Sequence, residues 1–474
     1  MKNTSTKSGQ TKPIPQKTEH GKSHHDCLDP SIRFACPQRR YIIRFFPGRQ
    51  LPDSPMAKIP TSPEQSRQFA IEVVRRLRDA GHEALWAGGC VRDEILGRIP
   101  ADYDVATAAR PDEVRAVFGH RRTLAVGAAF GVITVLGPPG GGQIEVATFR
   151  TDAAYTDGRH PAGVRFSTAI EDAQRRDFTI NGLFLDPLSG EVHDHVGGRA
   201  DLAAGVVRAI GSPALRFGED HLRMLRAVRF AAALNFALDG ETRGAIERMR
   251  HLVTTVSPER IAEELRGMVS RPGRRRALEL LADTGLAAEI LPEVAPGAAG
   301  AAADADTAWA AAARVIDALD EPGLPAALAA VFARARPQAL LQAASRLRLS
   351  NREGKLSGWL MEGVAELGAG DVETRPWPAM QPWLAHDDAR LLADLLRARA
   401  ACGLAPAPAA AWVTAQVARP RAELDPPPLV TGADLLAAGV PSGPEMGAIL
   451  ARIRRLQLGG EITTRAEALA RVRD

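Results

Sequence analysis

The sequence predicts an α+β protein in which a mixed domain precedes an almost wholly helical remainder. Short apolar runs alternate with helical patterns up to about residue 190, which indicates strands and helices within one domain. After Leu215, apolar residues recur at three- and four-residue spacing, as in amphipathic helices. The chain has 474 residues, 45% of them hydrophobic, so we expect about three domains with a sizeable core.

The composition argues against several other classes of protein. No stretch approaches the run of about 18 apolar residues that a membrane span needs, and the N-terminus lacks the apolar segment of a secretory signal. Cys27, Cys36, Cys90 and Cys402 are too few and too scattered for a disulfide framework. We therefore expect a cytoplasmic protein with no membrane contact. The net charge of +4 is compatible with a nucleic-acid partner and does not demonstrate one.

Residues 1–60 differ in composition from the rest of the chain. Five of the seven lysines fall within the first 22 residues, among Ser, Thr, Gln and Pro. We expect a disordered basic tail, or a misassigned start for which Met56 is the alternative. The alternative of a zinc site at His24, His25, Cys27 and Cys36 has a spacing that fits no common zinc pattern.

The expected elements follow the apolar periods in chain order. A helix is predicted over residues 62–78, with Ser62 as N-cap. A strand at 84–87 ends in Gly88-Gly89, and a helix over 91–96 follows. Further strands are predicted at 102–106, 131–136 and 143–149, and further helices at 219–235, 240–251, 257–270 and 273–285. Ala-rich helices continue to about residue 420.

Two carboxylates in the Asp102-Tyr103-Asp104 triplet are the first candidate site residues. Alternate residues of a strand point to the same face, so Asp102 and Asp104 should lie side by side. Like charges this close repel unless a cation lies between them, and hard oxygen ligands favour Mg²⁺. A paired-metal site clamps the attacking and leaving oxygens of a phosphoryl or nucleotidyl displacement. An isolated Asp-x-Asp triplet is also common in solvated turns.

The Gly88-Gly89 turn strengthens this interpretation. It lies between a strand and the start of a helix, where free backbone amides attract phosphate. Arg92, in the first turn of that helix, can add a charge-assisted bond to a triphosphate. The arrangement is neither a Walker A motif nor a Rossmann fingerprint, because the lysine of the first and the glycine spacing of the second are missing.

The segment Gly88 to Thr107 resembles the opening motif of the bacterial class of tRNA CCA-adding nucleotidyltransferases and their poly(A) polymerase relatives. The resemblance implies a polymerase-β-like nucleotidyltransferase head followed by an all-α neck, body and tail. It also implies two Mg²⁺ ions held by Asp102 and Asp104, with Mn²⁺ as a substitute. The expected boundaries are 61–212 for the head, 213–295 for the neck, 296–425 for the Ala-rich body and 426–474 for the tail module.

Further motifs of the family follow in its order. Glu145 is the candidate third catalytic carboxylate, which would hold the metal or receive the 3′-hydroxyl proton; the alternative is a surface residue on an edge strand. Residues 175–181 resemble the second motif. By that resemblance Arg176 faces the base or phosphates, Asp177 accepts a bond from the ribose 2′-hydroxyl, and Asn181 belongs to the same nucleotide site.

Residues 219–223 resemble the family's nucleotide template, in a predicted helix that also carries Arg226 and Arg229. Positions i and i+3 share a helix face, so Asp220 and Arg223 should point together. The carboxylate would accept from an exocyclic amine, and the guanidinium would donate to the ring acceptor beside it. Cytosine and adenine offer that pattern, whereas guanine and uracil present the reverse. The alternative is a helix cap with exposed arginines.

The resemblance implies an enzyme that adds CMP and AMP from CTP and ATP to the tRNA 3′ end. A poly(A) polymerase, an A-only-adding enzyme and an inactive RNA-binding relative remain alternatives. We expect no stable protein partner. Arg274, Arg275 and Arg276 are candidate tRNA contacts, or a solvated face. The stretch 300–425 carries no motif of the family, and His386-Asp387 is interpreted as an isolated surface dipeptide.

Overall fold

The computed structural model describes residues 62–152, 164–298 and 304–472. Backbone contacts divide the chain into Met1–Ala57 and Lys58–Asp474, and only the second unit holds described residues. The predicted tail and its His and Cys residues therefore lie outside the described part. In that part, no helix is long and apolar enough to cross a membrane.

The head is built on a seven-stranded sheet with the order β3-β4-β5-β2-β1-β8-β9. Its strands are β1 (Ala84–Ala87), β2 (Asp104–Thr107), β3 (Thr123–Leu124), β4 (Val132–Leu136), β5 (Gln143–Thr148), β8 (Leu183–Leu185) and β9 (Val192–Asp194). A separate pair is formed by β6 (Arg150–Asp152) and β7 (Val164–Phe166). The predicted strands at 84–87, 131–136 and 143–149 are thus present with small changes at their ends.

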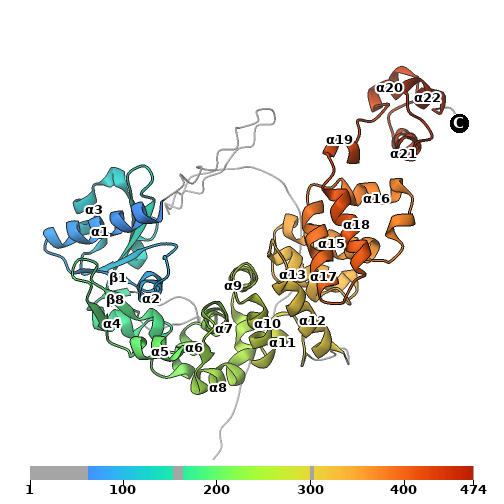
Figure 1. Cartoon of the computed structure of the whole chain (residues 1–474). Coiled ribbons are helices and arrows are strands. Elements are labelled where there is room, and N and C mark those ends of the chain that lie inside the picture. Colours follow the sequence, from blue (N-terminus) through green and yellow to red (C-terminus); the bar gives the residue numbers. More distant parts are fainter. Residues whose placement is uncertain (1–61, 153–163, 299–303, 473–474) are drawn as a thin grey trace, which may run out of the picture. The chain divides into compact units, whose positions relative to one another are not determined.

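Helices α1 (Pro63–Asp79) and α3 (Pro111–Phe118) pack on one face of this sheet (Figure 1). Their apolar residues share a core with Trp86, Val105 and Val146 of the strands. The alternate strand residues Leu85 and Ala106 belong to a smaller cluster on the opposite face, with residues of α4 (Ala169–Gln174). Because strand residues alternate, Asp104 and Glu145 lie on that second face, away from α1 and α3.

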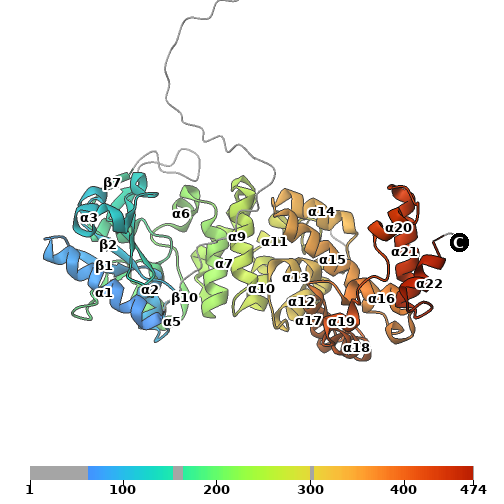
Figure 2. The same cartoon turned by 90° about the horizontal axis from the view of Figure 1, so that it is seen from above.

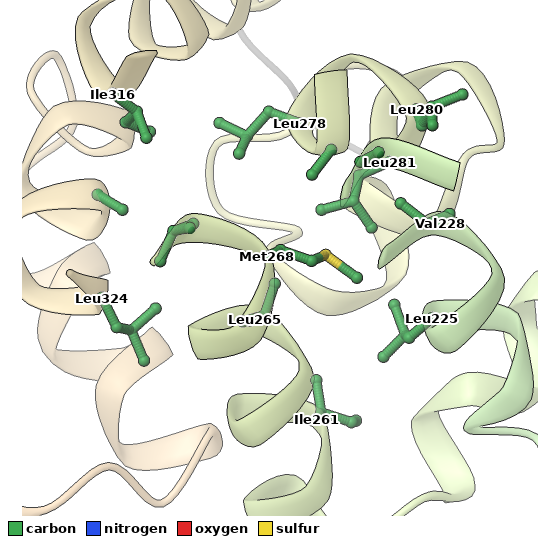
Figure 3. Packing of buried hydrophobic residues seen from close by; sticks show 14 of the residues in the cluster. Leu225, Val228, Ile261, Leu265, Met268, Leu278, Leu280, Leu281, Ile316 and Leu324 are labelled. Atoms are coloured by element: carbon green, nitrogen blue, oxygen red, sulfur yellow. The ribbon is translucent and has the colours of Figure 1, made fainter. Parts of the chain in front are cut away.

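The described chain after residue 212 is almost wholly helical, as predicted, apart from the short strand β11 (Ala237–Leu238), which pairs with β10 (Val206–Val207). Its first helices are α6 (Pro213–Glu219), α7 (Arg223–Leu234), α8 (Gly240–Met249), α9 (Pro258–Val269), α10 (Arg274–Asp283) and α11 (Leu286–Ile290). Helices α7, α9 and α10 lie side by side (Figure 2). Figure 3 shows their contact, in which Leu225 and Val228 of α7 face Leu265 and Met268 of α9 and Leu281 of α10.

The Ala-rich stretch forms eight further α-helices among the described residues. They are α12 (Ala305–Asp317), α13 (Leu324–Val331), α14 (Pro337–Arg346), α15 (Asn351–Leu367), α16 (Trp377–Leu384), α17 (Ala389–Ala401), α18 (Ala407–Val417) and α19 (Arg421–Leu424). The last three helices are α20 (Gly432–Ala437), α21 (Pro444–Leu458) and α22 (Arg465–Ala470). These three share a hydrophobic cluster of their own, from Val430 to Val472.

Two predicted elements are wrong in ways that affect the site. The strand expected from residue 102 begins at Asp104, so Asp102 lies in the bend before it. The helix expected over 219–235 is broken between α6 and α7. Asp220 lies in this break with extended backbone angles of φ −148° and ψ 106°. Asp220 therefore does not share a helix face with Arg223.

Candidate active site

Two carboxylates lie on the sheet face that α1 and α3 leave open, and a third, Asp102, precedes the strand. Parallel pairing of β2 with β5 places Asp104 directly opposite Glu145. The pKa of Asp104 is raised to about 6, first by burial among the cleft walls and then by the charges of Asp102 and Glu145, while Arg176 opposes the shift. Asp102 therefore lies close enough to act on Asp104, although it precedes the strand. The edge carries excess negative charge.

This acidic edge suits a divalent cation held jointly with a substrate. Among the described residues, no group of three His, Cys, Asp or Glu side chains forms a complete metal site. Mg²⁺ is commonly bound through one or two carboxylates, with substrate phosphates and water completing its shell. Asp102 and Asp104 offer that donor chemistry. The like-charge repulsion that raises the pKa of Asp104 is also what a cation would relieve.

The Gly88-Gly89 turn forms the wall beside these acids. Gly88 has a φ of +75°, and a Cβ there would lie 3.0 Å from Nη1 of Arg176. Both the backbone angle and the close approach therefore favour glycine. Helix α2 (Gly89–Ile95) begins at the second glycine of this turn, two residues earlier than predicted.

Two arginines of the cleft, Arg92 and Arg176, are held by buried partners. Arg92 donates from Nη1 to Oδ1 of Asn181 over 2.8 Å. Arg176 donates from Nη2 to Oδ2 of Asp172 over 2.9 Å, and Asp172 also binds Arg175. Burial alone would raise the pKa of Asp172, but Arg176 and Arg175 lower it below its ordinary value. The ionised Asp172 carboxylate thus holds the guanidinium groups of Arg175 and Arg176 in place.

Asp177 joins the head to helix α7. Its Oδ2 accepts two bonds from Arg226, of 2.9 and 2.7 Å, and its Oδ1 accepts one from Nδ2 of Asn181. Burial alone would raise the pKa of Asp177, but Arg226 and Asn181 lower it. The carboxylate is buried and accepts at both oxygens.

The side chains of Asp220 and Arg223 do not bind each other, although the backbone N–H of Arg223 donates to the carbonyl oxygen of Asp220 over 3.0 Å. Asp220 accepts bonds of 3.2 and 2.7 Å from Arg260 of α9, and its Oδ1 also accepts the backbone N–H of Leu222. Arg223 donates to Glu219 and to the carbonyl oxygens of Arg216 and Arg175. The expectation that the pair shares one helix face is wrong, because Asp220 lies outside the helix.

These side chains nevertheless line one cleft of about 480 Å³. Ten predicted nucleotide or metal residues line it: Gly88, Gly89, Arg92, Asp104, Arg176, Asp177, Asn181, Asp220, Arg223 and Arg226. Three of the predicted catalytic or nucleotide residues do not line the cleft. Asp102 and Glu145 lie near Asp104, and Arg229 binds Glu264 over 2.7 Å. The cleft is thus lined both by Asp104 and by the predicted template residues Asp220 and Arg223.

Four lining residues had no predicted role: Arg175 and Leu222, which lie within the motifs at 175–181 and 219–223, and Phe230 and Arg260. The guanidinium carbons of Arg92, Arg226 and Arg229 lie 5.4, 5.3 and 4.3 Å from the centre of the Phe230 ring. Phe230 is four residues after Arg226, so helical spacing gave a signal for this contact. Arg260 had no such signal, because its role depends on how α9 packs against α7.

The predicted RNA contacts on α10 do not share one surface. Arg274 donates to the carbonyl oxygens of Asp317 and Leu319, and Arg276 donates to that of Phe236. Arg275 is exposed and pairs with Glu279 over 2.8 Å. Arg274 and Arg276 therefore tie α10 to neighbouring elements, and Arg275 alone presents its charge to solvent.

Comparison with known proteins places this site in a recognised class. Residues 84–208 match the family described as "Poly A polymerase head domain". Residues 235–297 match "Probable RNA and SrmB- binding site of polymerase A". The sheet with its acidic edge and Gly-Gly turn lies within the first match.

Individual relatives are more specific. The chain is 42% identical over 222 residues to a CCA-adding enzyme of Lactobacillus johnsonii, which covers 47% of this chain and 54% of that protein. It thus spans about half the length of this curated relative. A Bacillus stearothermophilus CCA-adding enzyme in complex with CTP is 29% identical, with a TM-score of 0.63 over 86% of this chain and 97% of that one. A Thermotoga maritima CCA-adding enzyme complexed with tRNA_CCA shares the fold, at 18% identity and a TM-score of 0.58 over 85% and 94%.

The chain therefore has the fold of bacterial CCA-adding enzymes, with a mixed α/β head and a helical remainder. The resemblance to the family of tRNA CCA-adding nucleotidyltransferases and poly(A) polymerases is confirmed.

Proposed function

We propose that this protein is a nucleotidyltransferase that adds CMP and AMP, from CTP and ATP, to build or repair the 3′-terminal CCA of tRNA in the cytoplasm. The observation that carries the proposal is the cleft, which combines Asp104 at an acidic edge, a Gly-Gly turn and the two template residues. The similarity to CCA-adding enzymes supports it. The proposed parts are a head at 61–212, a neck at 213–295, a body at 296–425 and a tail at 426–474.

In this proposal the acidic edge holds divalent metal. Asp102 and Asp104 would bind two Mg²⁺ ions, with Mn²⁺ as a substitute, together with the triphosphate of the substrate. Bound there, such ions stabilise the charge that develops on the attacking and leaving oxygens. Glu145, opposite Asp104, adds negative charge to the same edge and can accept the proton of the tRNA 3′-hydroxyl.

The rest of the cleft binds the nucleotide. The backbone at Gly88 and Gly89 lets phosphate approach closely, and Arg92 and Arg176 supply positive charge on either side. Asp177 and Asn181 line the cleft next to Arg176 and form the ribose site. Because these side chains are fixed by buried partners, they require little reorganisation when the substrate binds.

The template residues select the base. Arg260 donates two hydrogen bonds to the Asp220 carboxylate and thereby orients it. A carboxylate can accept about four hydrogen bonds, so acceptor capacity remains for a base. The bonds of Arg223 to Glu219, Arg216 and Arg175 leave further N–H donors for the ring acceptor of a base. Asp220 then accepts the exocyclic amine of cytosine or adenine, and the reversed polarity of guanine and uracil is refused.

The direct test offers the purified protein tRNA transcripts that lack CCA, CA or A, each with single NTPs and with mixtures, and sequences the products. We expect C, C and A to be added in turn and synthesis to stop after A. Addition of A only to tRNA that already ends in CC would indicate an A-only enzyme, and continued A addition would indicate a poly(A) polymerase. No incorporation on any transcript would favour an inactive RNA-binding relative.

A further inference from the structure

A second cavity, of about 530 Å³, lies in the Ala-rich helical stretch and shares no lining residue with the nucleotide cleft. Residues of helix α15 and of the segment after α16 line it: Asn351, Arg352, Lys355, Leu356, Trp359, His386 and Asp388. Arg352, Lys355 and Trp359 recur at three- and four-residue intervals, so they form one stripe along α15. The cavity falls within the range of about 300–1,000 Å³ typical of small-ligand sites.

The cavity carries uncompensated positive charge. Arg352 and Lys355 are exposed, and within the described part of the chain neither forms an ion pair. Lys355 is also the single lysine after Lys58. Glu353, the acid between them in sequence, is committed to Arg266 over 2.7 Å. Asp388 is the one acidic residue lining the cavity. Two cations therefore face one carboxylate, which favours an anionic ligand.

The same cavity offers a flat aromatic surface. The ring of His386 stacks on that of Trp359, with 4.0 Å between their centres and 25° between their planes, and Trp383 lies 5.6 Å from Trp359. The backbone N–H of Asp388 donates to Nδ1 of His386 over 3.1 Å. Nδ1 therefore acts as an acceptor, which leaves Nε2 as the N–H donor of the neutral ring. The sequence suggested that His386 has no partners, but its ring contacts Trp359 and the backbone of Asp388.

We propose that this cavity binds one unpaired nucleotide of an RNA strand. The base lies against the Trp359–His386 ring pair, and the phosphate lies at Arg352 and Lys355. Stacking on aromatic side chains beside a cationic groove is how proteins hold unpaired bases with little sequence preference. The inference rests on the proposed function in taking RNA as the ligand, and it concerns a site outside the nucleotide cleft.

The test compares equilibrium binding of a tRNA transcript ending before CCA over a range of salt concentrations. The double variant R352A/K355A should bind about tenfold more weakly and lower the salt slope by about 0.7 to 0.9, the contribution of the one phosphate contact that is lost. His386→Ala should weaken binding by about fivefold to a hundredfold with the slope unchanged, because it removes stacking and no charge. CMP incorporation at saturating tRNA should match that of the unmodified protein in all variants.

The matched control is R314A/R336A, which removes two exposed arginines of the same helical stretch that have no ion pair among the described residues. It should retain affinity and slope. If R352A/K355A behaves like this control, the proposal is overturned.

Loss of AMP or CMP binding in the double variant with tRNA affinity unchanged would assign the cavity to a free nucleotide instead. Self-association of the unmodified protein that the double variant abolishes would assign it to a second copy of the chain. Failure of the unmodified protein to bind tRNA would overturn the proposed function as well.

Discussion

Asp220 and Arg223 line the same cleft, yet each is bound to a different partner. Arg260 holds the Asp220 carboxylate, with a shortest bond of 2.7 Å, and Glu219 holds the Arg223 guanidinium. The two side chains thus have separate supports within the cleft. We therefore propose that Arg260 positions the Asp220 carboxylate, a contact that the spacing of residues 219–223 does not reveal.

The first prediction concerns the paired acids. Asp102→Asn and Asp104→Asn should each lower CMP incorporation by about a thousandfold or more, because charge stabilisation at the reacting phosphate is lost. The fold should be retained.

Because the pKa of Asp104 is raised, its ionised form lowers the stability of the folded protein at neutral pH. At neutral pH, Asp104→Asn should therefore melt at or above the melting temperature of the unmodified protein. That gain should vanish below about pH 4. Near-normal turnover in either variant would contradict the assignment.

A second prediction follows from the pKa of Asp104, which is raised to about 6 by burial, Asp102 and Glu145. A raised pKa means that the carboxylate takes up its proton as the pH falls through about 6, where an ordinary Asp would still be ionised. At limiting Mg²⁺, kcat/KM should therefore decline below that pH. Glu145→Gln removes one of the causes and should move the midpoint to lower pH. A midpoint that stays in place in Glu145→Gln would show that Glu145 does not act on Asp104.

Arg226 and Asp177 provide a test of stability. Arg226→Met leaves the buried Asp177 carboxylate without its cation, which should cost about 2–4 kcal/mol, less than for fully buried pairs because Arg226 is partly exposed. The lowered pKa of Asp177 means that this contribution is present at neutral pH and disappears as the pH falls below about 4. The control Arg275→Met breaks an exposed helix pair and should leave the urea midpoint unchanged. Equal midpoints for both variants would refute the role of the pair.

The arginines of α10 should separate into two kinds. Arg275→Ala should lower the salt slope of tRNA binding by about 1 without changing the melting temperature, because this residue alone is exposed. Arg274→Ala should lower the melting temperature, since it removes bonds to the carbonyl oxygens of Asp317 and Leu319. An unchanged slope in Arg275→Ala would identify the run as a structural face.

Local patterns predicted much of the site because its parts follow strand and turn geometry. The Gly88-Gly89 turn and the outward side of Asp104 follow from a strand that ends in glycines and from the alternation of strand residues. The prediction that residues 220 and 223 share a helix face was wrong, because the chain leaves helical geometry at Asp220. Arg260 and the stacking of His386 on Trp359 depend on contacts between distant segments, which no local period encodes.

In the proposed function, Asp220 and Arg223 select the base through hydrogen-bond polarity. The most direct measurement is single-nucleotide incorporation with each of the four NTPs on tRNA ending before CCA. Asp220→Ala should let UTP or GTP compete, and Arg223→Ala should lose about 1–3 kcal/mol of discrimination, while Mg²⁺ and triphosphate binding persist. Variants that lose rate equally for all four nucleotides, with selectivity intact, would contradict the account.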